Sequence, residues 1–154
     1  MEQQIYNIED EKLGKEIVVV VHRRSIISAI NNLVEDHKAS PESEYPQVGR
    51  VDVNGKEVTQ GERNKDLLLI QDCITDLTDE RSFQAFIRKA IEQQPRKKNG
   101  SFAKGRVNNI VTFDSFGSYW EDSYGTNTPA IRARAKDDYT MEIVYEEFIV
   151  KYSR

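Results

Sequence analysis

The chain has 154 residues, which suits one domain and leaves no room for two of ordinary size. It is polar, with 38% hydrophobic and 31% charged residues, but its aromatic and β-branched content is too high for a disordered protein. The single cysteine excludes an intrachain disulfide and a cysteine-rich zinc site, and no apolar run is long enough to span a membrane or act as a signal peptide. We therefore expect an intracellular, cytoplasmic protein.

The N-terminal 14 residues are mostly polar and are expected to form a loosely attached arm or a short edge strand. Residues 15–154 are expected to form one domain. Its first element is a strand over Lys15 to His22, because the β-branched run from Ile17 to Val21 is apolar at every position. Such a run predicts a strand that is covered on both faces.

A helix is predicted next, with Ser25 as its N-cap and His37 near its end. Its apolar residues recur at helical spacing: Ile26, Ile27, Ile30, Leu33 and Val34. Residues 38–47 contain two prolines and are predicted to form a loop. Residues 48–59 are predicted to form a β-hairpin, because Asn54-Gly55 favours a two-residue turn between alternating strands.

Two further helices follow in the sequence. Asn64 is the predicted cap of the first, whose apolar face is Leu67, Ile70, Cys73, Ile74 and Leu77. Thr78 or Asp79 is the predicted cap of the second, and Pro95 lies just beyond its end. The second helix has an apolar stripe made of Phe83, Phe86, Ile87, Ala90 and Ile91.

The remaining regular segments are predicted to be strands. One covers residues 107–113, and another contains Ile131, Ala133 and Ala135 in alternation with basic residues. Residues 140–152 fit both a helical and a strand periodicity, and their β-branched and aromatic content favours a strand with a bulge at Glu146-Glu147.

A three-residue turn at 137–139 would place Ala135 opposite Met141 and Arg134 opposite Glu142. The order of elements predicts an α+β fold. We expect a single domain with a mostly antiparallel sheet of about five to six strands and about three helices packed on one face.

Evidence for an enzyme is weak. His22, followed by Arg23 and Arg24 at the end of a strand, is the best candidate, because this trio could bind a phosphate. Cys73 falls on an apolar helix face, which predicts a buried thiol rather than a nucleophile. No nucleotide-binding, hydrolase or metal-binding motif is present. We assign no catalytic residue, metal or cofactor, and an enzyme centred on His22 is the third hypothesis.

A basic segment at residues 95–106 supports the second hypothesis, a nucleic-acid or nucleotide-binding protein. The segment contains two glycines and is expected to be mobile, with cations that contact phosphates and one aromatic ring that stacks on a base. The residues concerned are Arg96, Lys97, Lys98, Phe102, Lys104 and Arg106.

A second loop, residues 115–128, supports the leading hypothesis. It combines Tyr119, Trp120 and Tyr124 with small polar residues, which is the composition of many protein-recognition surfaces. We therefore expect a non-enzymatic binding protein that associates stoichiometrically with a protein partner. A small regulator or inhibitor, of the kind that mobile elements encode, fits this description, and the outer face of the sheet also leaves room for a homodimer.

Overall fold

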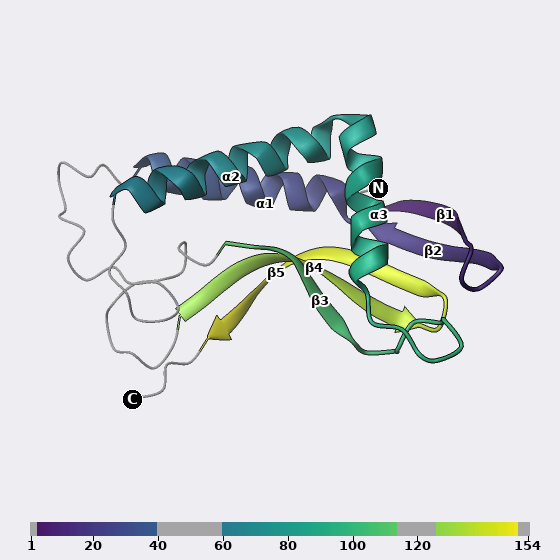
Figure 1. Ribbon diagram of the computed structural model, residues 1–154. Coiled ribbons are helices and arrows are strands. Elements are labelled where there is room, and N and C mark those ends of the chain that lie inside the picture. The colour runs from purple at the N-terminus through teal and green to yellow at the C-terminus, as the bar shows by residue number, and fades with distance from the viewer. Residues whose placement is uncertain (1–2, 40–59, 114–125, 151–154) are drawn as a thin grey trace.

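The computed structural model describes residues 3–39, 60–113 and 126–150, and in this part of the chain three helices cover one face of a five-stranded sheet (Figure 1). The order of the strands in the sheet is β1-β2-β5-β4-β3. In chain order the elements are β1 (Gln4–Asp10), β2 (Lys15–Val21), α1 (Arg23–Ala39), α2 (Gln60–Thr78), α3 (Glu80–Gln93), β3 (Val107–Thr112), β4 (Thr126–Asp137) and β5 (Thr140–Val150). The expected α+β class, with helices on one face, is confirmed.

Three of the four strand pairings are antiparallel. β1 pairs with β2, β5 with β4, and β4 with β3 in this way, whereas β2 and β5 are parallel. The chain therefore leaves β2, builds all three helices and the β3–β4 part of the sheet, and returns beside β2 with its last strand. The mostly antiparallel sheet is as predicted from the sequence.

The N-terminal segment is an edge strand. All seven residues of β1 are in register with β2, from Gln4 opposite Val21 to Asp10 opposite Lys15. Gly14 allows the tight turn between the two strands, because its φ of 67° lies in the left-handed region that side chains disfavour. Of the two expectations for residues 1–14, the short edge strand is found at Gln4–Asp10.

The core lies between the helices and the sheet. Ile17, Val19 and Val21 of β2 point toward the helices and are fully buried, whereas Val18 and Val20 on the opposite face are half-buried. The apolar run of β2 therefore predicts the strand correctly, but the expectation that both of its faces are covered is only partly right. Its outer face has no helix layer among the described residues.

Two predicted helix starts are wrong and one is right. α1 begins at Arg23, because the carbonyl of His22 already accepts the N–H of Ile26 at 2.9 Å, so Ser25 lies inside the helix and is not its cap. α2 begins at Gln60, before the expected cap Asn64. α3 is capped as expected by Asp79, whose carboxylate accepts the N–H of Ser82 at 2.9 Å.

The hairpin predicted for residues 48–59 lies outside the described residues, as does most of the loop predicted before it. The last segment is a strand, as predicted from its composition. Its register with β4 is also confirmed, with Ala135 opposite Met141 and Arg134 opposite Glu142. The bulge expected at Glu146-Glu147 is absent, because pairing is continuous there, and the irregularity lies instead between Ala135 and Asp137.

Candidate functional site

The residues expected to bind a partner, Tyr119, Trp120 and Tyr124, lie outside the described residues. The chain that leads to them is well anchored. Phe113, directly after β3, is buried, and its N–H donates to the carbonyl of Pro129 in β4 at 3.0 Å. The segment 114–125 therefore connects the adjacent strands β3 and β4.

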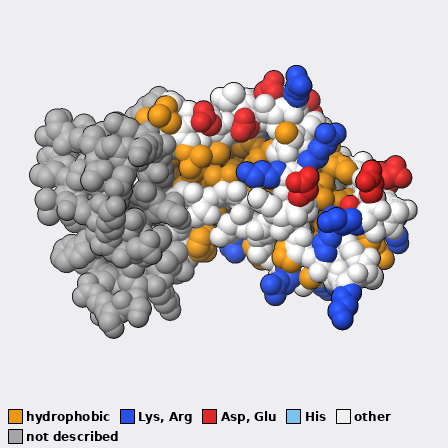
Figure 2. All heavy atoms as spheres, viewed as in Figure 1, with side chains coloured by type: hydrophobic (Ala, Val, Ile, Leu, Met, Phe, Trp, Pro, Cys, Tyr) orange, Lys and Arg blue, Asp and Glu red, His pale blue; other side chains and the backbone are white. Residues whose placement is uncertain are grey.

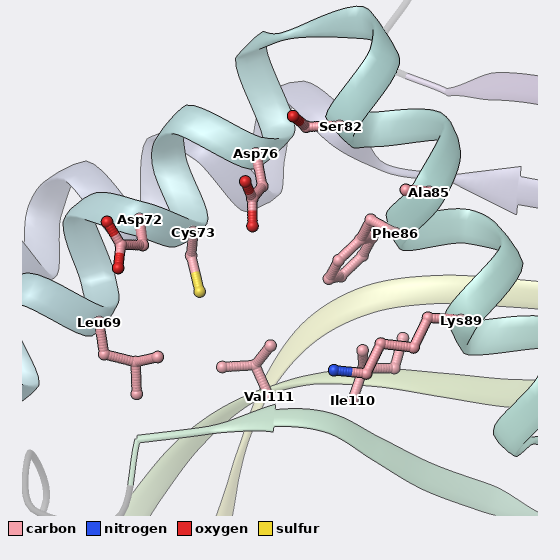
Figure 3. A pocket seen from close by; sticks show the side chains of 10 residues that line it. All are labelled: Leu69, Asp72, Cys73, Asp76, Ser82, Ala85, Phe86, Lys89, Ile110 and Val111. Carbon is pink, nitrogen blue, oxygen red and sulfur yellow. The ribbon is translucent and has the colours of Figure 1, made fainter.

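A cleft of about 480 Å³ opens beside β3, between that strand and the helices α2 and α3 (Figure 3). This volume is within the range of roughly 300–1,000 Å³ that is usual for ligand sites. Ten residues line it: Leu69, Asp72, Cys73 and Asp76 of α2, Ser82, Ala85, Phe86 and Lys89 of α3, and Ile110 and Val111 of β3.

The floor of the cleft is apolar. Ile110 and Val111 both line it although they are consecutive, which a regular strand does not allow because successive side chains point to opposite faces. The pairing of β3 with β4 shifts register between Asn109 and Val111, and this β-bulge turns the two side chains to one side. Phe86 points into the cleft from α3, opposite the thiol of Cys73 on α2 (Figure 3).

The rim of the cleft is charged. Asp72 and Asp76 are four residues apart on α2 and therefore lie on one side of that helix, while the amino group of Lys89 reaches in from α3 (Figure 3). Among the described residues, none of these three side chains takes part in a salt bridge. The cleft thus combines an apolar floor with two carboxylates and one amino group that form no salt bridge with the residues the structure describes.

The surroundings of the Cys73 thiol in the cleft change its pKa. Burial, followed by the carboxylates of Asp76 and then Asp72, raises the pKa of Cys73 to about 11, and Lys89 opposes them with the smallest effect. Cys73 is only 8% exposed. The expectation that it is a buried thiol is confirmed, and at neutral pH it remains protonated.

The sequence contains a signal for the exposed apolar surface beside this cleft. Leu67, Leu68 and Leu69 are consecutive, and three neighbouring positions on a helix cannot all face the core. In the structure Leu68 is 60% and Leu69 is 41% exposed, with Leu69 at the mouth of the cleft. Phe86, which the helical stripe assigned to the core, is half-buried and lines the cleft instead.

The basic segment is partly held by contacts within the fold. Arg96 forms a salt bridge with Asp10 of β1 at 2.6 Å, and Lys97 forms one with Asp138 at 2.7 Å. Phe102, the aromatic residue expected to stack on a base, is fully buried in the core. The side chains of Lys97, Lys98, Lys104 and Arg106 are exposed.

The segment is also tied down by its backbone. Lys97 N–H donates to the carbonyl of Ser101 at 2.8 Å, Phe102 N–H to that of Asp138 at 2.8 Å, and Arg96 and Phe102 form a β-bridge. Gly100 has a φ of 90°, and a Cβ there would lie 3.4 Å from the carbonyl of Lys12. The expectation of a mobile loop is therefore wrong, because the segment is a tight turn packed against the β1–β2 turn.

His22, Arg23 and Arg24 do not converge on one site. His22 Nε2 lies 2.6 Å from Glu142 Oε2 of β5, toward the outer face of the sheet. Arg23 is on the helix side, where its Nε donates to the carbonyl of Leu77 at 2.6 Å and its guanidinium stacks on Phe83. Arg24 is exposed. The phosphate-binding trio suggested by the sequence is thus divided between the two sides of the sheet.

Within the described ranges, no three His, Cys, Asp or Glu side chains are grouped so that they could hold a metal ion, and no helix is long and apolar enough to cross a membrane. Comparisons with protein-family models, with curated proteins and with solved structures found no match for this chain.

Proposed function

We propose that this protein is a non-enzymatic binding protein that associates stoichiometrically with a protein partner, as a small regulator or inhibitor. The observation that carries the proposal is the open cleft between α2, α3 and β3, whose strand wall leads directly into the segment that contains Tyr119 and Trp120. Val111 in the cleft is only eight positions from Tyr119.

The surface around the cleft supports protein association. In Figure 2 apolar side chains form a band along the underside of α2 on the viewed face. Contiguous apolar surface on a soluble domain is characteristic of interaction sites, because leaving it in water is costly. Tyrosine and tryptophan are also enriched among the few residues that supply most of the binding free energy in protein interfaces.

Quantitative affinity capture tests the proposal. The tagged protein and its Tyr119→Ala/Trp120→Ala variant are expressed in the native cell, and their co-purified proteins are compared by mass spectrometry. We expect a partner that the wild type retains in fixed stoichiometry and that the variant loses, while circular dichroism shows an unchanged fold. Equal retention by both proteins would contradict the role of the aromatic segment.

A second measurement separates this proposal from the nucleic-acid alternative. Labelled single- and double-stranded oligonucleotides are titrated with the protein at about 50 and about 200 mM salt, because phosphate contacts give a steep salt dependence. We expect flat anisotropy curves, since Arg96 and Lys97 are paired within the fold and Phe102 is buried. Tight, salt-sensitive binding would favour nucleic acid as the ligand and would count against a protein partner.

A further inference from the structure

We infer that the cleft between α2, α3 and β3 binds an extended peptide segment of the partner that carries one bulky apolar side chain next to a lysine or arginine. This inference rests on the proposed function and adds the chemistry of the partner to it. The anchor side chain would enter the cleft between Phe86, Cys73 and Val111. The neighbouring cation would lie against the carboxylates of Asp72 and Asp76.

The apolar half of this inference follows from the walls of the cleft. α2, α3 and β3 each contribute apolar side-chain atoms to the floor of the cleft. The β-bulge of β3 turns both Ile110 and Val111 toward it. Bulges re-aim side chains and are frequent beside functional sites. An apolar anchor that displaces water from such a floor would contribute much of the binding free energy.

The basic half follows from the charges on the rim. Asp72 and Asp76 are the only charged residues in the last three turns of α2, from Leu67 to Thr78. Their carboxylates are exposed and take part in no salt bridge with any residue in the described ranges. Their effect on the thiol of Cys73 exceeds the opposing effect of Lys89. The cleft is therefore electronegative on the α2 side, and a ligand cation complements it.

A peptide fits this site better than a small molecule. Small-molecule sites usually bury most of their ligand, whereas apolar side chains form an open band beneath α2 on the face seen in Figure 2. Leu69 is exposed at the mouth of the cleft, and the exposed side chain of Leu68 beside it adds apolar surface on α2 outside the lining. Several successive residues of a peptide can use such an elongated surface.

The test uses phage-displayed random 12-residue peptides, selected on the full-length protein and on a variant with the cleft filled. Ala85→Trp fills the cleft from α3, where Ala85 is exposed, and Gln71→Trp adds the same side chain to α2 at an exposed position outside the cleft. We expect wild type and Gln71→Trp to enrich peptides with a large apolar residue beside Lys or Arg. Ala85→Trp should not enrich them.

The charge requirement is measured with a synthetic peptide of the enriched sequence. Asp72→Asn/Asp76→Asn should weaken its binding about fivefold and reduce its salt dependence, because two rim charges are lost. Glu9→Gln/Glu16→Gln is the matched control, since it removes two exposed carboxylates from the β1–β2 pair and should leave binding unchanged. If Ala85→Trp lowers the melting temperature, Leu69→Lys at the exposed mouth of the cleft replaces it.

Three outcomes would overturn the inference. The first is that wild type enriches no peptides over Ala85→Trp, and the second is that it enriches acidic peptides. The third is that Ala85→Trp changes the oligomeric state, which would identify a second copy of the chain as the occupant of the cleft. The capture experiment distinguishes a failure of this inference from a failure of the proposed function. If the captured partner is lost with Tyr119→Ala/Trp120→Ala but retained by Ala85→Trp, protein binding stands and the cleft is not its site. If no partner is captured in fixed stoichiometry, the proposed function itself is wrong.

Discussion

The guanidinium of Arg96 lies 2.6 Å from the carboxylate of Asp10, and this salt bridge joins the segment after α3 to the N-terminal edge strand. The two side chains are only 12% and 11% exposed, and Arg96 also donates to the carbonyl of Gly100 at 2.8 Å. Removal of Arg96 would leave the Asp10 carboxylate buried without a partner. We expect Arg96→Ala to lower the free energy of unfolding by about 2–4 kcal/mol in urea denaturation.

Lys98→Ala is the control for this prediction. Lys98 lies two residues away in the same turn, but its side chain is exposed. Its removal should change the free energy of unfolding by less than about 0.5 kcal/mol. Equal effects of the two substitutions would show that the basic segment is not held by its salt bridge.

Phe102 tests whether the basic segment is structural or a nucleic-acid site. Its ring is fully buried and lies 5.0 Å from the Arg96 guanidinium. Phe102→Ala should destabilise the protein by about 3–5 kcal/mol, whereas Phe102→Leu should cost much less because most of the buried volume is kept. Thermal denaturation measures both. A stable Phe102→Ala protein would contradict the buried position of this ring.

Arg23 joins the start of α1 to the junction between α2 and α3. Its Nε donates to the carbonyl of Leu77 at 2.6 Å, its Nη1 lies 3.0 Å from the Glu80 carboxylate, and its guanidinium covers the ring of Phe83. Arg23→Lys keeps the charge but loses the planar group that makes these contacts together. We expect a loss of about 1–2 kcal/mol in chemical denaturation. The same change at the exposed neighbour Arg24 should have little effect.

Asp79 gives a prediction of pH dependence. Hydrogen bonds from the backbone N–H and then the hydroxyl of Ser82 lower the pKa of Asp79 below 3.8. Because the folded state has the lower pKa, the cap stabilises the fold above that pH, and this stabilisation is lost as pH falls through the folded value. The melting temperatures of wild type and Asp79→Ala should therefore differ at about pH 6 and converge toward about pH 2. Asp79→Asn should show a smaller pH-dependent difference, since its amide oxygen caps without titrating.

Cys73 provides a single-site probe of the cleft. With a pKa of about 11, about one thiol in a thousand is ionised at about pH 8, against about one in ten for a thiol with the ordinary value of 9.0. We expect the native protein to react with a thiol reagent at least about a hundredfold more slowly than the urea-unfolded chain. Rapid labelling of the native protein would show that the thiol is neither buried nor protonated. A peptide bound in the cleft should slow the reaction further.

The local sequence pattern was sufficient to predict many of the helices and strands. The β-branched run after Lys15 and the apolar stripe from Phe83 to Ile91 lie within β2 and α3, where the structure has a strand and a helix. The pairing of Arg134 with Glu142 was predicted correctly, but from a three-residue turn that is wrong. Asp137 pairs with Thr140, and a register shift between Ala135 and Asp137 restores the expected pairing. Helix starts were less predictable, since the first turn of α1 is set by its direct connection to β2, with only His22 between them.

The sequence by itself determined the fold class, the main strands and helices of the described chain and the identity of most core residues, because periodicity depends on neighbours a few positions apart. Only the tertiary structure decided which charged and aromatic residues serve the fold. Arg96 and Asp10 are 86 positions apart, so no local pattern indicates that they form a salt bridge. The cleft likewise depends on the packing of α2 and α3 over a bulged strand, and its apolar floor and acidic rim come together only when those three segments meet.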